Sequence, residues 1–195
     1  MNGIFGQQAQ PEKRKIFVSF HHADQAYRDE FDKRFGDAFI SMSVDYGDID
    51  SENSTDYIKR LIQEDHIIHS SVVVALYGAQ TRNRKHVDWE ISAGLSEKVG
   101  GRKGLVVILL PGFQASPFTE WGAYDESRVY PHLHPRTATN LKNGYGKLYY
   151  WPGLYTHPSI VDHQINTVLE EAVSRRDSLA DIVDNSHPQY ERNLA

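Results

Sequence analysis

The 195-residue sequence contains no cysteine, which excludes disulfide bonds and thiolate chemistry and makes a cytoplasmic setting the expected one. It also has no run of about 18 apolar residues, which a transmembrane helix requires. The first residues lack the basic-then-apolar order of a signal peptide. The net charge of −5 provides no basic excess for a nucleic-acid surface. We therefore expect one globular domain with neither a nucleic-acid nor a membrane partner.

Several nucleotide-binding motifs are missing as well. Neither G-x-G-x-x-G after the first predicted strand nor G-x-x-x-x-G-K-[ST] occurs, which argues against dinucleotide-binding Rossmann proteins and P-loop proteins. A flavodoxin phosphate loop needs several hydroxyls, but only Ser19 is present, and Tyr77 and Gly78 stand where a phospho-receiver has its aspartate. His66 and His69 have no third ligand at a recognisable spacing, so we predict no metal site.

Short apolar runs alternate with segments of helical periodicity. Buried strands are predicted at 16–20, 71–77 and 105–110, and further strands at 41–46 and 148–152. Helices are predicted from Asp24, the expected N-cap of the first, from about Ser54, and over 83–98 and 159–173. This order predicts an α/β, flavodoxin-like, doubly wound parallel five-stranded sheet with helices on both faces.

The boundaries of the domain follow from composition. Residues 1–13 are predicted to be a flexible lead, and residues 14–176 the domain. Residues 112–147, rich in proline and glycine, are predicted to be an irregular insertion before the last strand and helix. The polar residues 177–195 are predicted to be a frayed tail.

Glu90 interrupts the apolar face of the helix predicted at 83–98. Val87 and Ile91 would hold this helix against the sheet, and Glu90 would lie about 10 Å along it at ~1.5 Å per residue. That places it near the carboxyl edge of the strands, where doubly wound sheets bind ligands. A carboxylate there can bind ribose hydroxyls or stabilise an oxocarbenium-like centre. The alternative is a glutamate that reaches water or pairs with Arg82 or Lys98.

Two stretches of the sequence together resemble a known family. They are F-V-S-F-H-H-A-D and S-S-V-V-V-A-L-Y-G-A-Q-T-R-N-R-K-H-V-D-W-E-I, in this order on the first strand and on the third strand with its loop and helix. Over about residues 14–111 the chain resembles the TIR-like domain family of bacterial anti-phage signalling proteins. The likeness is closest to the TIR subunit of the Thoeris defence system.

The resemblance implies an NAD-consuming enzyme, an NAD+ nucleosidase with ADP-ribosyl cyclase-like activity. Glu90 would be the catalytic residue that cleaves the nicotinamide–ribose bond. NAD is then the substrate, and no cofactor is implied. The product would be ADP-ribose or a cyclic ADP-ribose isomer, a diffusible nucleotide signal that a downstream effector reads in anti-phage defence.

The same resemblance predicts the residues that surround the substrate. The predicted substrate-binding residues are Ser19, Phe20, His21, Asp45, Ser51, Gly78, Thr81 and His86. Core packing for Phe20 and a turn for Gly78 are the alternatives. His86 departs from the family, which has a tryptophan four residues before the glutamate, while Trp89 stands next to Glu90. Either the imidazole remakes the pocket wall, or Trp89 acts outside the pocket.

Two other functions stay open at this point. A non-catalytic TIR-like module would act by self-association or by binding other TIR domains, and a Glu90→Gln protein that assembles normally but loses signalling would exclude it. An N-deoxyribosyltransferase-like enzyme would use Glu90 as a covalent nucleophile, and a trapped glycosyl adduct would favour it.

Overall fold

The computed structural model describes residues 13–42, 66–152 and 165–195. Asp45, Ser51 and the helix predicted from Ser54 lie outside these residues. One sheet is formed by β1 (Arg14–Ser19), β2 (Phe39–Met42), β3 (Val72–Tyr77), β4 (Gly104–Leu109) and β5 (Gly146–Tyr150). The strands are all parallel, in the order β2-β1-β3-β4-β5. This arrangement confirms the predicted α/β sheet.

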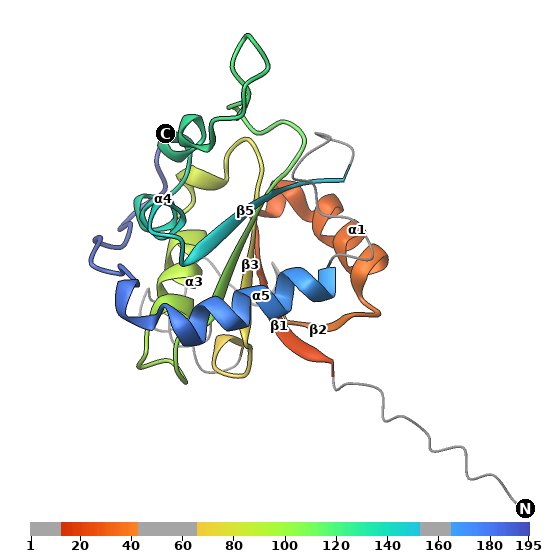
Figure 1. Cartoon of the computed structure of the whole chain (residues 1–195), viewed down its shortest axis with the longest axis vertical. Coiled ribbons are helices and arrows are strands. Elements are labelled where there is room, and N and C mark those ends of the chain that lie inside the picture. Colours follow the sequence, from red (N-terminus) through yellow and green to blue (C-terminus); the bar gives the residue numbers. More distant parts are fainter. Residues whose placement is uncertain (1–12, 43–65, 153–164) are drawn as a thin grey trace, which may run out of the picture.

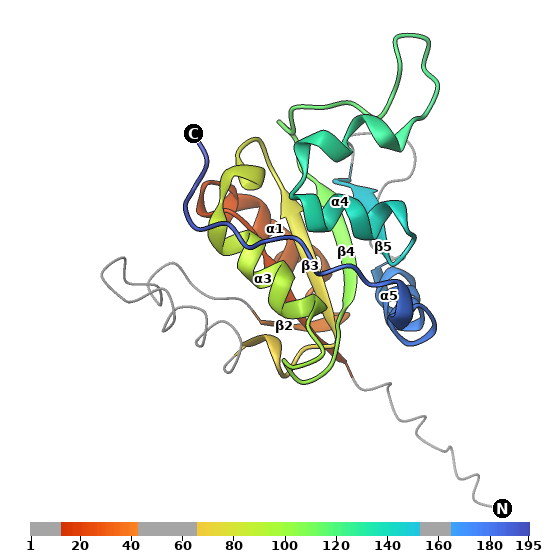
Figure 2. The same cartoon turned by 90° about the vertical axis from the view of Figure 1, so that its left-hand side faces the viewer.

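Four α-helices of the described residues cover the two faces of the sheet (Figures 1 and 2). They are α1 (Gln25–Phe35), α3 (Lys85–Leu95), α4 (Pro135–Lys142) and α5 (Ile165–Ser178). One apolar cluster joins α1 and α5 to one face, and another joins α3 and α4 to the opposite face. Helices on both faces are the mark of a doubly wound fold. None of the described helices is long and apolar enough to cross a membrane.

The strand sequences explain why both faces are covered. All six residues of β3 are buried, as expected for a central parallel strand. Because side chains alternate along a strand, Val74 and Leu76 belong to the α1–α5 cluster, whereas Ala75 and Tyr77 belong to the α3–α4 cluster. The near-continuous apolar run that predicted this strand is therefore divided between two cores.

Residues 112–147 are less irregular than predicted. They contain the 3₁₀ turns Glu126–Arg128 and Tyr130–His132, all of α4 and the first residues of β5. Pro135 occupies the first turn of α4, where its missing N–H leaves no intrahelical bond unmade. Thus a proline that suggested a loop instead begins a helix.

The prediction of a frayed C-terminal tail is wrong. After α5 and the 3₁₀ turn Ala180–Ile182, the chain runs across α3 and α4, which Figure 2 shows as a dark blue trace. Residues 184–194, hereafter the C-terminal segment, are held by hydrogen bonds to both helices and to the turn before α3, beginning with Asn140 at Asp184 and ending with Asn83 at Leu194. The polar groups of this segment therefore form hydrogen bonds with the helices, although the sequence suggested that they are solvated.

Gly104 allows α5 to approach β4 closely. A Cβ at this position would lie 2.6 Å from the carbonyl oxygen of Ala172, a rigid backbone atom. We expect Gly104→Ala to push α5 from β4 and lower the free energy of unfolding by about 1–3 kcal/mol. Gly146→Ala is the matched control, because its Cβ would meet movable leucine side chains at 3.0 Å or more. Urea denaturation measures both, and an equal loss would contradict this view of the α5 contact.

Candidate active site

The candidate site lies where β1 and β3 end at the carboxyl edge of the sheet. Ser19 is the last residue of β1, and its register partner on β3 is Ala75. Gly78 follows β3, and a 3₁₀ turn, Thr81–Asn83, leads from there into α3. The order of strands therefore brings the loops after β1 and β3 side by side, with the first turns of α3 above them.

Glu90 contacts Ser19 directly. The Ser19 hydroxyl donates a hydrogen bond of 2.5 Å to Oε2 of Glu90, and the two side chains come from segments 71 residues apart in the chain. Glu90 is only 7% exposed and Ser19 is fully buried. Burial raises the pKa of Glu90 to about 8, although the hydrogen bond from Ser19 acts in the opposite direction. The free protein therefore holds Glu90 mainly protonated at neutral pH.

The helix explains how a carboxylate comes to be buried here. Val87 and Ile91 pack in the α3–α4 cluster against the sheet, which sets the approximate rotation of α3. Glu90, three residues after Val87, is turned by this rotation toward the end of β1. Nine of the eleven residues of α3 are buried, so the helix has almost no solvated face on which Glu90 could lie.

A second carboxyl group, Asp24, lies at the same edge. The backbone N–H of Gly78 donates to Oγ1 of Thr81 at 2.9 Å, and the Thr81 hydroxyl donates to Oδ2 of Asp24 at 3.2 Å. A Cβ on Gly78 would lie 2.3 Å from Oδ1 of Asp24, so any other residue at this position would displace the Asp24 carboxylate. Burial raises the pKa of Asp24.

Asp24 was not predicted as a site residue. It does stand at the N-cap of α1, as predicted, but its side chain makes no capping hydrogen bond. Its partner is instead Thr81, 57 residues away. An Asp before an apolar helical repeat is so typical of a cap that no local signal separates the two roles.

Two histidines at this edge have lowered pKa values. Burial, with the charges of His22 and Arg84, lowers the pKa of His21 to about 4. Burial and the charge of Lys85 also lower the pKa of His86. Both imidazoles are therefore neutral at pH 7 and can serve as hydrogen-bond donor and acceptor without repelling a cationic ligand.

Two nitrogen atoms near α3 are buried without a partner. Within the part of the chain that the structure describes, Nε2 of His86 and Nε of Arg84 make no hydrogen bond. Buried polar atoms are normally paired, so unpaired ones at a sheet edge mark places that a ligand can satisfy. Arg84 was not predicted from the sequence, because a single basic residue before a helix is common on protein surfaces.

Trp89 lies away from the Ser19–Glu90 contact. It is 2% exposed and packs in a third apolar cluster with Phe17, Val73 and Ala93. Its Nε1 donates to the carbonyl oxygen of Tyr190 at 2.8 Å. Of the two interpretations of this tryptophan, the structure favours a role outside the pocket.

The remaining predicted residues are placed as follows. Phe20 is half-buried and packs against the α1–α5 cluster, as its core-packing alternative implies. Asp45 and Ser51 lie outside the described residues. The contacts above bring Ser19 together with Glu90, and Gly78 together with Thr81. Among the described residues, no group of three or more His, Asp or Glu side chains is arranged to hold a metal ion.

A parallel sheet in this order, with helices on both faces and a buried glutamate on the helix after β3, defines the chain as a flavodoxin-like α/β domain with a candidate site at the carboxyl edge of its sheet. Comparison with family models matches residues 17–115 to the family described as Thoeris protein ThsB, TIR-like domain. Because the match spans just over half of the chain, the protein belongs to this family, which supports a role in anti-phage signalling. A search of curated proteins gives no significant match. α4, β5, α5 and the C-terminal segment lie beyond the matched residues.

Proposed function

We propose that this protein cleaves the nicotinamide–ribose bond of NAD and releases a cyclic ADP-ribose-type signal. The observation that supports the proposal most is the buried Glu90 carboxyl, held by Ser19 at the ligand-binding edge of the sheet. The family to which the chain belongs is compatible with NAD-related chemistry. The proposal assigns the reaction to Glu90 and substrate binding to the groups that surround it.

In the proposed reaction the C–N bond at the anomeric carbon breaks, and both bonding electrons leave with nicotinamide. The ring is cationic in NAD and neutral once released, so the leaving group needs no proton. Positive charge develops on the ribose, and an ionised carboxylate in a water-poor site stabilises it. Addition of water and loss of its proton then gives ADP-ribose, whereas attack by another group of the same molecule gives a cyclic isomer.

The raised pKa of Glu90 is compatible with this role. A cationic nicotinamide ring beside the carboxyl favours its ionised form. We therefore propose that the proton held by Glu90 in the free protein leaves as NAD binds. His21 and His86, both neutral at pH 7, would add no repulsion to the cationic ring. Arg84, with an unpaired Nε, would suit the pyrophosphate, since guanidinium groups bind phosphate oxygens well.

The experiment that tests this function compares wild type with Glu90→Gln. Purified protein is incubated with NAD, dilute and under crowding that promotes assembly, and the products are separated and identified by mass spectrometry. Glu90→Gln is expected to slow nicotinamide release at least about a hundredfold, because the amide carries no charge to stabilise the ribosyl cation. The nucleotide product shows whether water or an internal group attacks.

Glu97→Gln serves as the matched control, since Glu97 follows α3 and its side chain is 74% exposed. It is expected to leave the rate unchanged. Release by Glu90→Gln at the wild-type rate would contradict the assignment of Glu90. Absence of release by wild type under both conditions would instead favour the second candidate function.

A non-catalytic assembly module is that second candidate, and one surface feature favours it. Residues 117–125 form a hairpin that projects from the domain, seen at the top of Figure 1, with a β-bridge between Phe118 and Tyr124. Trp121 at its tip is 94% exposed. An exposed tryptophan on an ordered loop is typical of residues that anchor protein interfaces. Under this function, Glu90→Gln would leave both association and signalling intact.

A further inference from the structure

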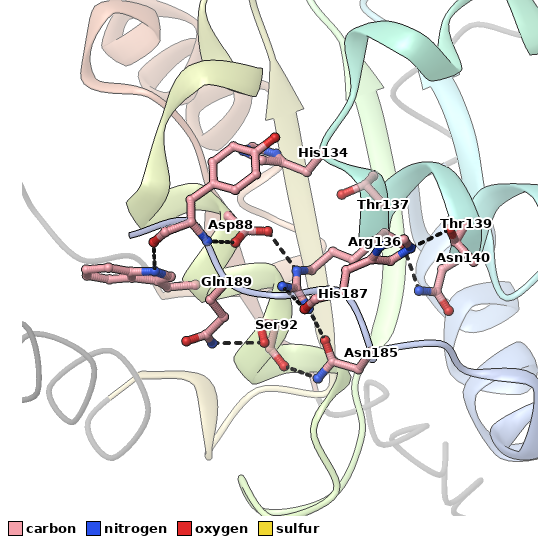
Figure 3. Close-up of polar contacts among 12 residues, drawn as sticks. Asp88, Ser92, His134, Arg136, Thr137, Thr139, Asn140, Asn185, His187 and Gln189 are labelled. Carbon is pink, nitrogen blue, oxygen red and sulfur yellow. Dashed lines mark hydrogen bonds and ion pairs between the residues drawn. The ribbon is translucent and has the colours of Figure 1, made fainter. Parts of the chain in front are cut away.

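The C-terminal segment binds α3 and α4 as an extended peptide would bind a groove (Figure 3). The Asn140 side chain pairs with both backbone groups of Asp184, accepting from its N–H at 3.0 Å and donating to its carbonyl at 2.6 Å. Arg136 donates to the carbonyl of His187 at 2.7 Å. Asp88 accepts from the backbone N–H of Tyr190 at 2.8 Å. The helices therefore recognise the backbone of this segment at several points.

A buried ion pair lies at the centre of these contacts. Nε of Arg136 donates to Oδ1 of Asp88 at 2.7 Å, and both side chains are 1% exposed. The remaining Arg136 nitrogens point to the C-terminal segment, where Nη1 donates to Oδ1 of Asn185 at 2.5 Å. The ion pair thus joins α3 and α4. The C-terminal segment provides the other hydrogen-bond partners of the Arg136 side chain and the backbone N–H from which Asp88 accepts.

The residues of α3 that bind the segment flank Glu90. Asp88 and Trp89 immediately precede it, and both bond to Tyr190. Ser92, two residues after it, accepts from Asn185 through its carbonyl at 2.9 Å and from Gln189 through its hydroxyl at 3.0 Å. The turn of α3 that carries Glu90 therefore packs against the sheet on its inner face and is bound by the C-terminal segment on its outer face.

We infer that the C-terminal segment is a positioning element for Glu90, which fixes the rotation and axial position of α3 so that the carboxyl meets Ser19. Apolar packing of Val87 and Ile91 tolerates small sliding of a helix, whereas directional hydrogen bonds on its outer face do not. The contact between Ser19 and Glu90, at 2.5 Å, is sensitive to such sliding. The family match ends at residue 115, so α3 lies within the matched residues and the C-terminal segment lies beyond them.

The catalytic consequence rests on the proposed function. A displacement of about 1 Å in a reacting group can lower a rate by about a hundredfold, and partial loosening costs less. A loosened α3 would also admit water beside Glu90, so the pKa of its carboxyl would fall from about 8 toward its ordinary value of 4.5. This second effect exists whether or not the protein cleaves NAD.

The test uses full-length Asn185→Ala, which removes both the bond to Ser92 and the bond to Arg136. Ser186→Ala is the matched control, because Ser186 is exposed and, among the described residues, its hydroxyl bonds within the segment, to Asp184 at 2.6 Å. Gln189→Ala is a second variant that acts on the same turn of α3. Three quantities are measured: the pKa of the Glu90 carboxyl by carbon NMR, amide exchange in α3, and kcat with NAD.

Asn185→Ala and Gln189→Ala are expected to lower the pKa of Glu90 by at least about one unit and to speed amide exchange in α3. They are expected to lower kcat about tenfold, while Ser186→Ala matches wild type. If amide exchange in α3 becomes faster but the pKa of Glu90 stays at its wild-type value, the segment is structural only and the inference is wrong. This outcome does not depend on NAD cleavage, whose failure in wild type would count against the proposed function alone.

Discussion

Glu90→Gln is expected to stabilise the folded protein at pH 9, by an amount on the order of 5 kcal/mol, and to have little effect at pH 4. Burial raises the pKa of this carboxyl from 4.5 to about 8. Below pH 4.5 it is protonated in both the folded and the unfolded chain. As the pH rises toward 8, the unfolded chain loses the proton but the folded protein keeps it, so folding becomes less favourable. Above pH 8 the full cost is present.

Urea denaturation of both proteins across this range measures the effect. Glutamine does not titrate and still accepts the hydrogen bond from Ser19, so the difference in free energy of unfolding should grow steadily between pH 4.5 and 8. Glu97→Gln, at an exposed position, is expected to change stability by less than about 1 kcal/mol at any pH. A Glu90→Gln difference that does not change with pH would mean that Glu90 is ionised and solvated in the folded protein.

This stability cost bears on why the sequence places a glutamate, Glu90, on the apolar face of a helix. A residue that destabilises the fold increasingly as the pH rises above about 4.5 persists more readily where function needs it. The spacing of its neighbours Val87 and Ile91 correctly predicted which side of the helix packs against the sheet, because apolar periodicity is a local property of the sequence. The alternation of elements predicted a doubly wound sheet and so placed Glu90 near the carboxyl edge of its strands, and the observed strand order brings it to the end of β1.

The contacts that the sequence did not predict are all long-range and polar. Asp88, Arg136 and Asn140 are no more than 1% exposed, yet each has the side chain of a surface residue. Their partners in the C-terminal segment are equally polar. From the sequence, both sets of residues were therefore expected to lie on the surface in contact with water. Asp24 was hidden in the same way, since a cap and a buried acceptor use the same residue type. Composition separates apolar from polar residues, but it does not show which polar groups pair with each other.

Buried pairs of this kind make single substitutions costly, and Arg136→Met is expected to lower the free energy of unfolding by about 3–5 kcal/mol. The substitution leaves Asp88 charged and without its cation at a site that is 1% exposed. It also removes the bonds from Arg136 to Asn185 and to the carbonyl of His187. Limited proteolysis should then cut the C-terminal segment, because its central anchor is lost.

The double variant Asp88→Asn with Arg136→Met separates the charge from the geometry. Asparagine is neutral, and its carbonyl oxygen can still accept from the backbone of Tyr190, so much of the stability should return. Arg14→Met, which breaks a partly exposed ion pair with Glu170, is expected to cost less than about 1 kcal/mol. Similar losses in the free energy of unfolding for Arg136→Met and Arg14→Met would contradict the view that the Arg136–Asp88 pair is buried. A large loss of stability in Arg136→Met that the double variant partly restores would show that most of the loss comes from leaving the buried Asp88 carboxylate without its cation.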